Sequence, residues 1–457
     1  MSKWGDRMWL VMAAALWAAV GALKLQVGRV IPFDALAMIL LIFAVFIRVF
    51  PVRGTAAIAA RWRPSGSKVF YMAVGALVLA GLLSGIHAAE FAIWAVEVAT
   101  FSYIGVMLVA VDMFTHDKVQ RFLRVGGWVF AFLCGVFGIL SVSNLLGGPK
   151  AFWFYEFSPV RGYTEKFTGM MRFANQWSGY FVGIFPLVLA LIFETKTPWK
   201  RMLLMACAVV GAATVPASGS RSGIFLLVFQ TLGFLVMYAM LSRSGKAMSR
   251  LVYLALFAVA GAGAYFLTYE VLGDSAIIQR SFGAFELVFE QEEFADSWRT
   301  YNWTLAWEEW LEHPIIGMGL GTFELFHDKH EIHSSYLSFL AETGLLGVTP
   351  YLLLIIIPVV QMGRALTYGA ARGRTDIWLI ALLVAVGTQV IFAIHHNNTR
   401  HRHVWVMLLM GSLYAEVAVR RLKFELQTER QAREQQKAQW HQKSATSLQS
   451  TSPPESS

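Results

Sequence analysis

The residues best suited to chemistry are arginines and histidines that stand in short polar segments between long apolar runs. Arg221 lies in the turn SGSRSG at 218–223, where Ser220 and the glycines leave room for an anion near the backbone. A guanidinium is permanently charged, and its planar fork of donors fits phosphate oxygens. We interpret Arg221 as a candidate phosphate-binding residue. The alternative is an arginine that only extends its charged end to the membrane interface.

Three further arginines lie in segments of the same kind. Arg280 and Arg299 belong to a strongly acidic stretch, 270–334, in which ion pairs with neighbouring carboxylates are an equally good interpretation. Arg172 precedes FANQW at 173–177, at the entry to an apolar run, where an ordinary interface anchor is the alternative. Each of the three is therefore a candidate for the same anion site as Arg221.

His333 opens the segment HSSYL at the start of an apolar run, and Glu342 follows nine residues later. A histidine with a pKa near 6.5 can take a proton from a hydroxyl nucleophile. His333 is therefore a candidate general base, and a polar residue at a helix end is the alternative.

Two groups of histidines raise the question of a metal site. The run H-x2-H-x2-H that ends at His333 does not place three imidazoles on one helical face, and no HExxH motif accompanies it. The histidines at 395–403, with Arg400 among them, suit the wall of a polar cavity equally well. We therefore expect no metal site at these histidines. The chain has neither a P-loop nor a Rossmann fingerprint, so ATP-driven transport has no support in its sequence.

The composition indicates a membrane protein. Of the 457 residues, 56% are hydrophobic and 15% are charged, and the mean hydropathy is +0.54. Soluble domains carry about 25% charged residues, so an ordinary cytosolic enzyme and a disordered chain are excluded. Two cysteines cannot build a disulfide framework. The net charge of +9 is attributed to loops on one side of a membrane, not to a nucleic-acid partner.

Apolar runs long enough to span a bilayer predict an all-α polytopic membrane protein with about twelve transmembrane helices. We place these spans at 8–23, 32–50, 68–86, 90–111, 126–146, 177–194, 202–218, 222–241, 251–269, 335–361, 377–394 and 403–419. With a cytoplasmic N-terminus, the inside segments hold 26 of the 38 Lys and Arg residues, and the C-terminus also lies in the cytoplasm.

This topology divides the chain into four parts. Residues 1–269 hold the first nine spans, and 270–334 form a large outer loop. In that loop, tryptophans and apolar residues at near-helical spacing predict an amphipathic helix over 296–312 that lies at the membrane interface. Residues 335–419 hold the last three spans. The tail at 420–457 is expected to begin as an amphipathic helix and to be largely disordered.

Several motifs follow one another over roughly 170–347. They are Phe173-Ala174-Asn175 before a span, Ser220-Arg221-Ser222-Gly223, Trp298-Arg299, His313-Pro314 followed by a Gly-x-Gly element at 317–321, and an H-[NS]-x2-L-x4-E-x-G-x2-G pattern from His333 to Gly347. In this combination the chain resembles the O-antigen ligase and Wzy-type O-antigen polymerase superfamily of bacterial membrane glycosyltransferases, and most of all the ligase.

The resemblance implies a GT-C-like fold and a multi-pass protein of the bacterial inner membrane. It implies transfer of a glycan from undecaprenyl diphosphate to an acceptor sugar, such as lipid A core, at a periplasmic active site, without a metal or cofactor. Direct displacement would invert the configuration of the anomeric carbon. A polymerase of O-antigen or exopolysaccharide is the near alternative, and a transporter of lipid-linked glycans is the second.

The same resemblance assigns roles to the candidate residues. His333 would be the base, and Arg221 and Arg299, with Arg280 and Arg172, would hold the donor diphosphate. Other candidates for the site follow from the same motifs and from the polar segments beside the spans. These are Asn175, Ser220, Glu342, His313 and Arg400.

Overall fold

The computed structural model describes residues 3–21, 32–49, 68–115, 118–145, 153–158, 162–242, 292–326 and 331–449. These residues form helices and one antiparallel hairpin of two strands, β1 (Trp153–Ser158) and β2 (Gly162–Phe167). The longer helices are α1 (Lys3–Ala19), α2 (Pro32–Val49), α4 (Lys68–Ser84), α5 (Phe91–Thr115), α6 (Val119–Leu145), α7 (Ala174–Glu194), α8 (Pro198–Ala212), α10 (Arg221–Leu241), α13 (Glu292–Glu312), α15 (Ser335–Ala370), α16 (Ile377–His395) and α17 (Arg402–Gln449). Two helices of one turn each are α9 (Thr214–Ala217) and α14 (Phe323–Phe326).

The helices coincide with the predicted spans, apart from 251–269, which lies outside the described residues. Within the described part of the chain, seven helices are long and apolar enough to cross a membrane: α5, α6, α7, α8 with α9, α10, α15 and α16. Shorter apolar helices cover Pro32–Ile42 and Lys68–Ser84. The polytopic helical class is therefore confirmed, and the number twelve stays a prediction.

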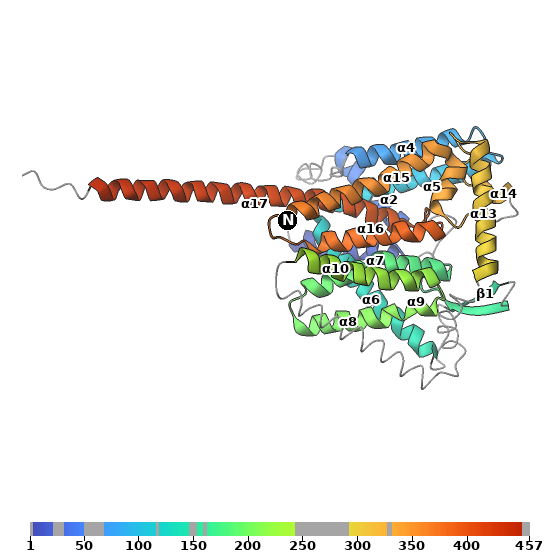
Figure 1. The fold of residues 1–457 in the computed structure, drawn as a ribbon, viewed down its shortest axis with the longest axis horizontal. Coiled ribbons are helices and arrows are strands. Elements are labelled where there is room, and N and C mark those ends of the chain that lie inside the picture. The colour runs from blue at the N-terminus through green and yellow to red at the C-terminus, as the bar shows by residue number, and fades with distance from the viewer. Residues whose placement is uncertain are drawn as a thin grey trace, which may run out of the picture.

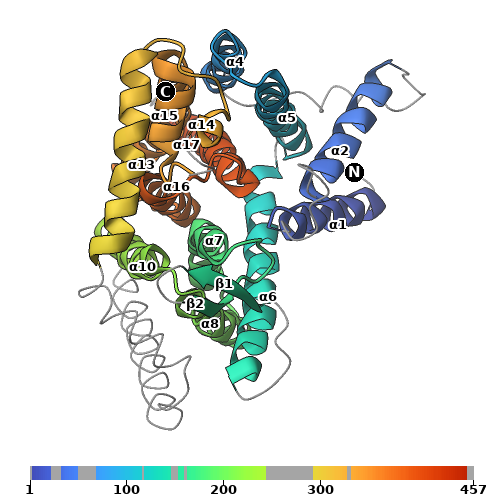
Figure 2. The ribbon, with the colours of Figure 1, turned by 90° about the vertical axis from the view of Figure 1, so that its right-hand side faces the viewer.

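The long helices form one bundle with two different ends (Figure 1). The N-terminus and the extended part of α17 lie at one end, and α13 and the hairpin lie at the other, called the α13 end from here on. Figure 2 looks onto the α13 end and shows α13 crossing it from the side of α10 to the side of α4. The helix predicted over 296–312 is thus present, and it runs across the ends of the other helices.

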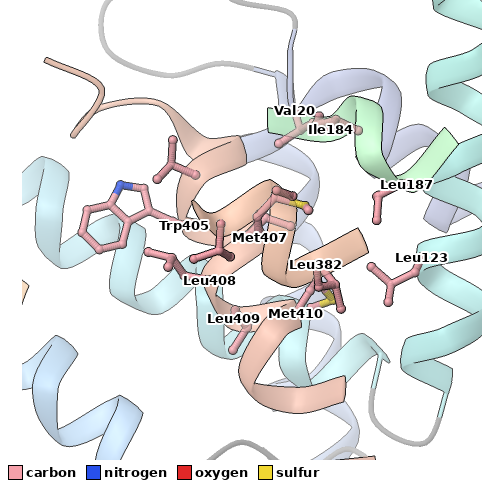
Figure 3. Close-up of a cluster of buried hydrophobic side chains, with 14 of the residues drawn as sticks. Val20, Leu123, Ile184, Leu187, Leu382, Trp405, Met407, Leu408, Leu409 and Met410 are labelled. Carbon is pink, nitrogen blue, oxygen red and sulfur yellow. The ribbon is translucent and has the colours of Figure 1, made fainter. Parts of the chain in front are cut away.

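The centre of the bundle is α7, which packs against α6, α10, α16 and α17. Almost every residue of α7 from Trp177 to Phe193 is buried. Gly179 and Gly183 permit close approach of α16, because a Cβ atom at either position would lie within 2.6 Å of Phe392 or Gln389. Small residues serve this purpose where membrane helices meet. Figure 3 shows part of the surrounding core: Val20, Leu123, Ile184, Leu187, Leu382, Trp405, Met407, Leu408, Leu409 and Met410.

The C-terminal tail differs from the sequence expectation. Where a largely disordered segment was expected from 420 onward, α17 continues without a break to Gln449 and extends away from the bundle. The tail is rich in Ala, Glu, Gln, Arg and Lys, all of which have high helix propensity. The polarity that suggested disorder therefore also suits a solvated helix.

Candidate active site at the α13 end

Arg221 is the first residue of α10. Ser220 is the N-cap, and its hydroxyl accepts a hydrogen bond from the Gly223 amide at 3.3 Å. The N-terminus of a helix carries unpaired amides and a partial positive charge, both of which favour anions. Arg221 is half-buried, and no hydrogen-bond or ion-pair partner of its guanidinium lies among the residues that the structure describes. This end of α10 is arranged to bind an anion.

His333 stands directly before α15, whose N-cap is Ser334. It is partly buried, and burial together with the Arg299 guanidinium lowers the pKa of the His333 imidazole below its usual 6.5. Desolvation and a nearby cation both disfavour the charged imidazolium. The neutral form of His333, which can accept a proton, is therefore favoured.

Arg299 reaches this site from α13, the helix that crosses the end of the bundle. It acts electrostatically on His333 and also on His396, which caps the C-terminus of α16. Burial, Arg299 and His333 lower the pKa of His396 to about 3, so that this second imidazole is neutral as well. Arg299, His333 and His396 thus form one cluster.

His396 joins this cluster to α10. Its Nε2 lies 2.9 Å from the hydroxyl of Ser222, the residue after Arg221. The first residues of α10, the residue before α15 and the middle of the outer loop therefore meet at one place. From the sequence, the histidines at 395–403 were interpreted as a cavity wall, and His396 was not assigned to the site. The sequence feature that could have pointed to it is a histidine at the end of a span.

The Gly-rich segment after His313 holds the start of α15 in place. Gly344 interrupts α15 with φ 61° and ψ −160°, and this break frees carbonyl groups and amides of the helix. The amides of Met318 and Gly319 donate to the Ala341 and Glu342 carbonyls at 2.9 and 3.1 Å, and the Leu345 and Leu346 amides donate to the Pro314 and Ile315 carbonyls at 3.0 and 3.1 Å. We call these four bonds the glycine clasp.

The glycine clasp leads to a stability prediction. A Cβ atom at Gly344 would lie 2.4 Å from the Ile315 carbonyl, so Gly344→Ala adds this overlap to a backbone strain of about 1–3 kcal/mol. We expect a clearly lower midpoint of thermal unfolding in detergent. The control is Gly363→Ala in the same helix, where a Cβ atom meets nothing within 4 Å and alanine is the better helix former. Equal midpoints for both variants would show that the clasp does not stabilise the protein.

Two candidates occupy a cavity on the side of α5. Arg400 forms a two-contact ion pair with Glu97 of α5, at 2.8 and 3.1 Å, and Glu97 itself is almost fully buried. Glu342 lines the same cavity, whose volume of about 20 Å³ has room for a water molecule. Its lining also includes Ser338, Asn397 and Thr399. Because Ile332 belongs to the lining, the cavity begins one residue from His333.

The remaining candidates fall into three groups. His313 directly precedes Pro314 of the glycine clasp, and its ring packs against that of His87 at an angle of 31°, with ring centroids 4.5 Å apart. Among the described contacts, none joins His313 to His333. Arg172 and Asn175 are exposed at the start of α7, where the Arg172 guanidinium lies 5.4 Å from the ring of Phe173. The residues that lie outside the described part of the chain are Arg280, His327 and His330.

A comparison with protein families matches part of the chain. Residues 206–352 match the family model described as O-antigen ligase. We call this matched segment the O-antigen ligase domain. The domain contains Arg221, Arg299, His333 and the whole glycine clasp, whereas His396 and Arg400 lie beyond it. No curated protein matches the chain.

The O-antigen ligase domain belongs to a family of membrane glycosyltransferases of the ligase and polymerase type, whose substrates are lipid-linked glycans. The match confirms the resemblance seen in the motifs, and the family implies membrane glycosyltransferase activity. The match ends within α15, so the last two helices, α16 and α17, and the loop between them lie outside it.

Proposed function

We propose that this protein is an O-antigen ligase with a GT-C-like fold, which transfers a glycan from undecaprenyl diphosphate to a hydroxyl of lipid A core. The α13 end would face the periplasm, and both termini would lie in the cytoplasm. The observation that carries the proposal is that the Arg299 guanidinium acts on the imidazole of His333 and, with burial, lowers its pKa. A base and an anion-binding group are the two functions that this transfer requires, and they share one site here.

In the proposed reaction the acceptor hydroxyl attacks the anomeric carbon of the donor sugar. His333 takes the hydroxyl proton as the new carbon–oxygen bond forms, and the bond between the anomeric carbon and the phosphate oxygen breaks. The bonding electrons leave with the diphosphate. Arg221, Arg299 and the N-terminal amides of α10 stabilise its added negative charge. Attack opposite the leaving group inverts the anomeric carbon.

The donor site would include two further arginines. Arg172 is exposed at the start of α7, where a lipid-linked diphosphate could reach it from the bilayer surface. Arg280 retains the role that the family resemblance gives it. With several guanidinium groups on the diphosphate, charge stabilisation would not require a metal ion, because a fixed cation serves the same electrostatic purpose.

The glycans of a strain that lacks this protein test the ligase assignment. We expect lipid A core without long glycan chains and an accumulation of polymer on the lipid carrier, because the missing step is the transfer itself. The wild-type gene supplied in trans is the control and should restore the long chains. Loss of the polymer, with single repeats remaining on the carrier, would instead identify a polymerase.

A further inference from the structure

The segment that joins α16 to α17, residues 396–402 with the first residue of α17 included, connects the helices of the site to one another. We call it the hub loop. Its polar side chains bond to five helices or to the residues that cap them. The partners are Ser222 of α10 for His396, Ser338 of α15 for Asn397, Gln389 of α16 for Asn398, Glu97 of α5 for Arg400 and Asp34 of α2 for Arg402.

One end of the hub loop is anchored by ion pairs. Arg402 binds Asp34 through two contacts of 3.1 and 3.0 Å, and both side chains are buried. Breaking such a pair leaves an uncompensated buried charge, which is strongly unfavourable. The Arg402 guanidinium also donates to the Arg400 carbonyl at 2.6 Å, which ties it to the residue that holds Glu97. The loop is therefore fixed relative to α2 and α5.

The other end of the hub loop bonds to α10. The buried His396 ring stacks on Phe392, with centroids 4.3 Å apart, so its orientation is fixed before it meets Ser222. The bond of 2.9 Å between its Nε2 and the Ser222 hydroxyl is made next to Arg221. Movement of His396 would therefore move the anion-binding end of α10.

The middle of the hub loop bonds to α15. The Asn398 amide donates to the Ser335 hydroxyl at 3.0 Å, and that hydroxyl lies 2.9 Å from the Asn398 side-chain oxygen. The side-chain nitrogen of Asn398, Nδ2, donates to the side-chain oxygen of Gln389. The side-chain nitrogen of Gln389 in turn donates to the Gly179 carbonyl of the central helix α7. Ser335 is two residues from His333. The buried Asn398 thus connects the base to the core of the bundle.

We propose that His396 and Asn398 are positioning residues that set the separation between the donor arginine and the base. His396 acts through Ser222 on Arg221, and Asn398 acts through Ser335 on His333. Both lie outside the O-antigen ligase domain, so the last two helices supply the frame for a site whose reacting groups lie inside it. This inference rests on the proposed function, because it assigns donor binding to one side chain and proton transfer to the other.

Substitutions of His396 and of Asn398 should have different kinetic effects. Since a misplacement of about 1 Å can cost 10²-fold in rate, we expect a change of about tenfold for each lost bond. His396→Phe and Ser222→Ala should raise KM for the lipid-diphosphate donor and weaken its direct binding. Asn398→Ala should lower kcat and leave donor binding unchanged. His396→Gln, whose amide can still bond to Ser222, should recover part of the donor affinity.

A double substitution tests the contact itself. If Ser222 and His396 act through one bond, the variant with both Ser222→Ala and His396→Phe should bind donor no worse than His396→Phe alone. Thr388→Ala is the control, because it removes a hydroxyl that bonds the Val384 carbonyl of its own helix α16. We expect this variant to match the wild type in KM, kcat and donor binding.

Two results would overturn the positioning roles while the proposed function stands. In the first, the wild type transfers glycan, but the losses of donor binding caused by Ser222→Ala and His396→Phe add up in the double variant. The second is an equal loss of donor binding in the His396 and Asn398 variants. A well-folded wild type that neither binds donor nor transfers glycan would refute the proposed function and this inference with it.

Discussion

Replacing His333 by alanine is expected to abolish practical glycan transfer and to leave donor binding intact. Removal of a general base costs about 10²–10⁴-fold in rate. The lowered pKa of His333 favours the proton-accepting form of the native imidazole at pH 7, so the base is available in the wild type and missing in the variant. Binding should survive, since the diphosphate contacts are assigned to arginines.

The measurement for His333→Ala is the initial rate of transfer by purified protein in detergent. His441→Ala, in the extended part of α17, is the matched control and should transfer at the wild-type rate. Normal transfer by His333→Ala would remove the base assignment and direct the search to His313, His327 or His330. An equal loss in donor binding would mean that His333 holds substrate and does not act as a base.

Replacing Arg221 by alanine is expected to weaken donor binding as well as turnover. The guanidinium stands at the N-terminus of α10, where it and the helix amides would bind the diphosphate together. Loss of one oxyanion donor costs about 10²–10³-fold in kcat in comparable sites. Arg221→Lys should recover only part of this loss, because an ammonium keeps the charge and loses the planar fork.

Arg201→Ala provides a matched control for Arg221. Arg201 lies near the start of the neighbouring helix α8, and its guanidinium donates to the Thr195 carbonyl at 2.6 and 3.1 Å. The predicted topology places it on the other side of the membrane from Arg221. Donor affinity should stay at the wild-type level in this variant. If Arg221→Ala also binds donor as the wild type does, the diphosphate must be held by Arg299, Arg280 or Arg172.

The elements around the site could be predicted from sequence where the signal is local. Apolar length located the helices, and the spacing of Trp298, Trp307 and Trp310 with Tyr301 and Leu305 located α13. The placement of Arg221 and His333 at the same end follows from counting the helices between them, since each crossing reverses the direction of the chain. These predictions needed no knowledge of side-chain packing.

The hub loop could not be predicted in this way. The bonds of His396, Arg400 and Arg402 join residues that are 174, 303 and 368 positions apart in the chain. Contacts at such separation leave no periodicity in the sequence. A histidine or arginine after a span looks the same whether it faces a buried serine, a buried carboxylate or the membrane surface.

The glycine clasp shows a different limit. The sequence showed only a Gly-x-Gly element at 317–321, whereas in the structure Gly317, Gly319 and Gly321 adopt positive φ angles and pack closely. A Cβ atom at Gly317 would lie 2.3 Å from the backbone of Glu342, and one at Gly321 would lie 2.4 Å from the Glu97 side chain. Each glycine is required by a neighbour that is distant in the chain. The motif can be recognised in the sequence, but the contacts that require glycine at these positions are seen only in the folded structure.

The central claim is that one protein binds a lipid-linked diphosphate and uses His333 to transfer its glycan. The most direct test measures donor binding and glycan transfer on the same purified preparations of wild type and His333→Ala, in detergent, where transport has no meaning. We predict that both proteins bind the donor with similar affinity and that only the wild type forms product. Binding without product formation by the wild type would contradict the claim and favour a transporter.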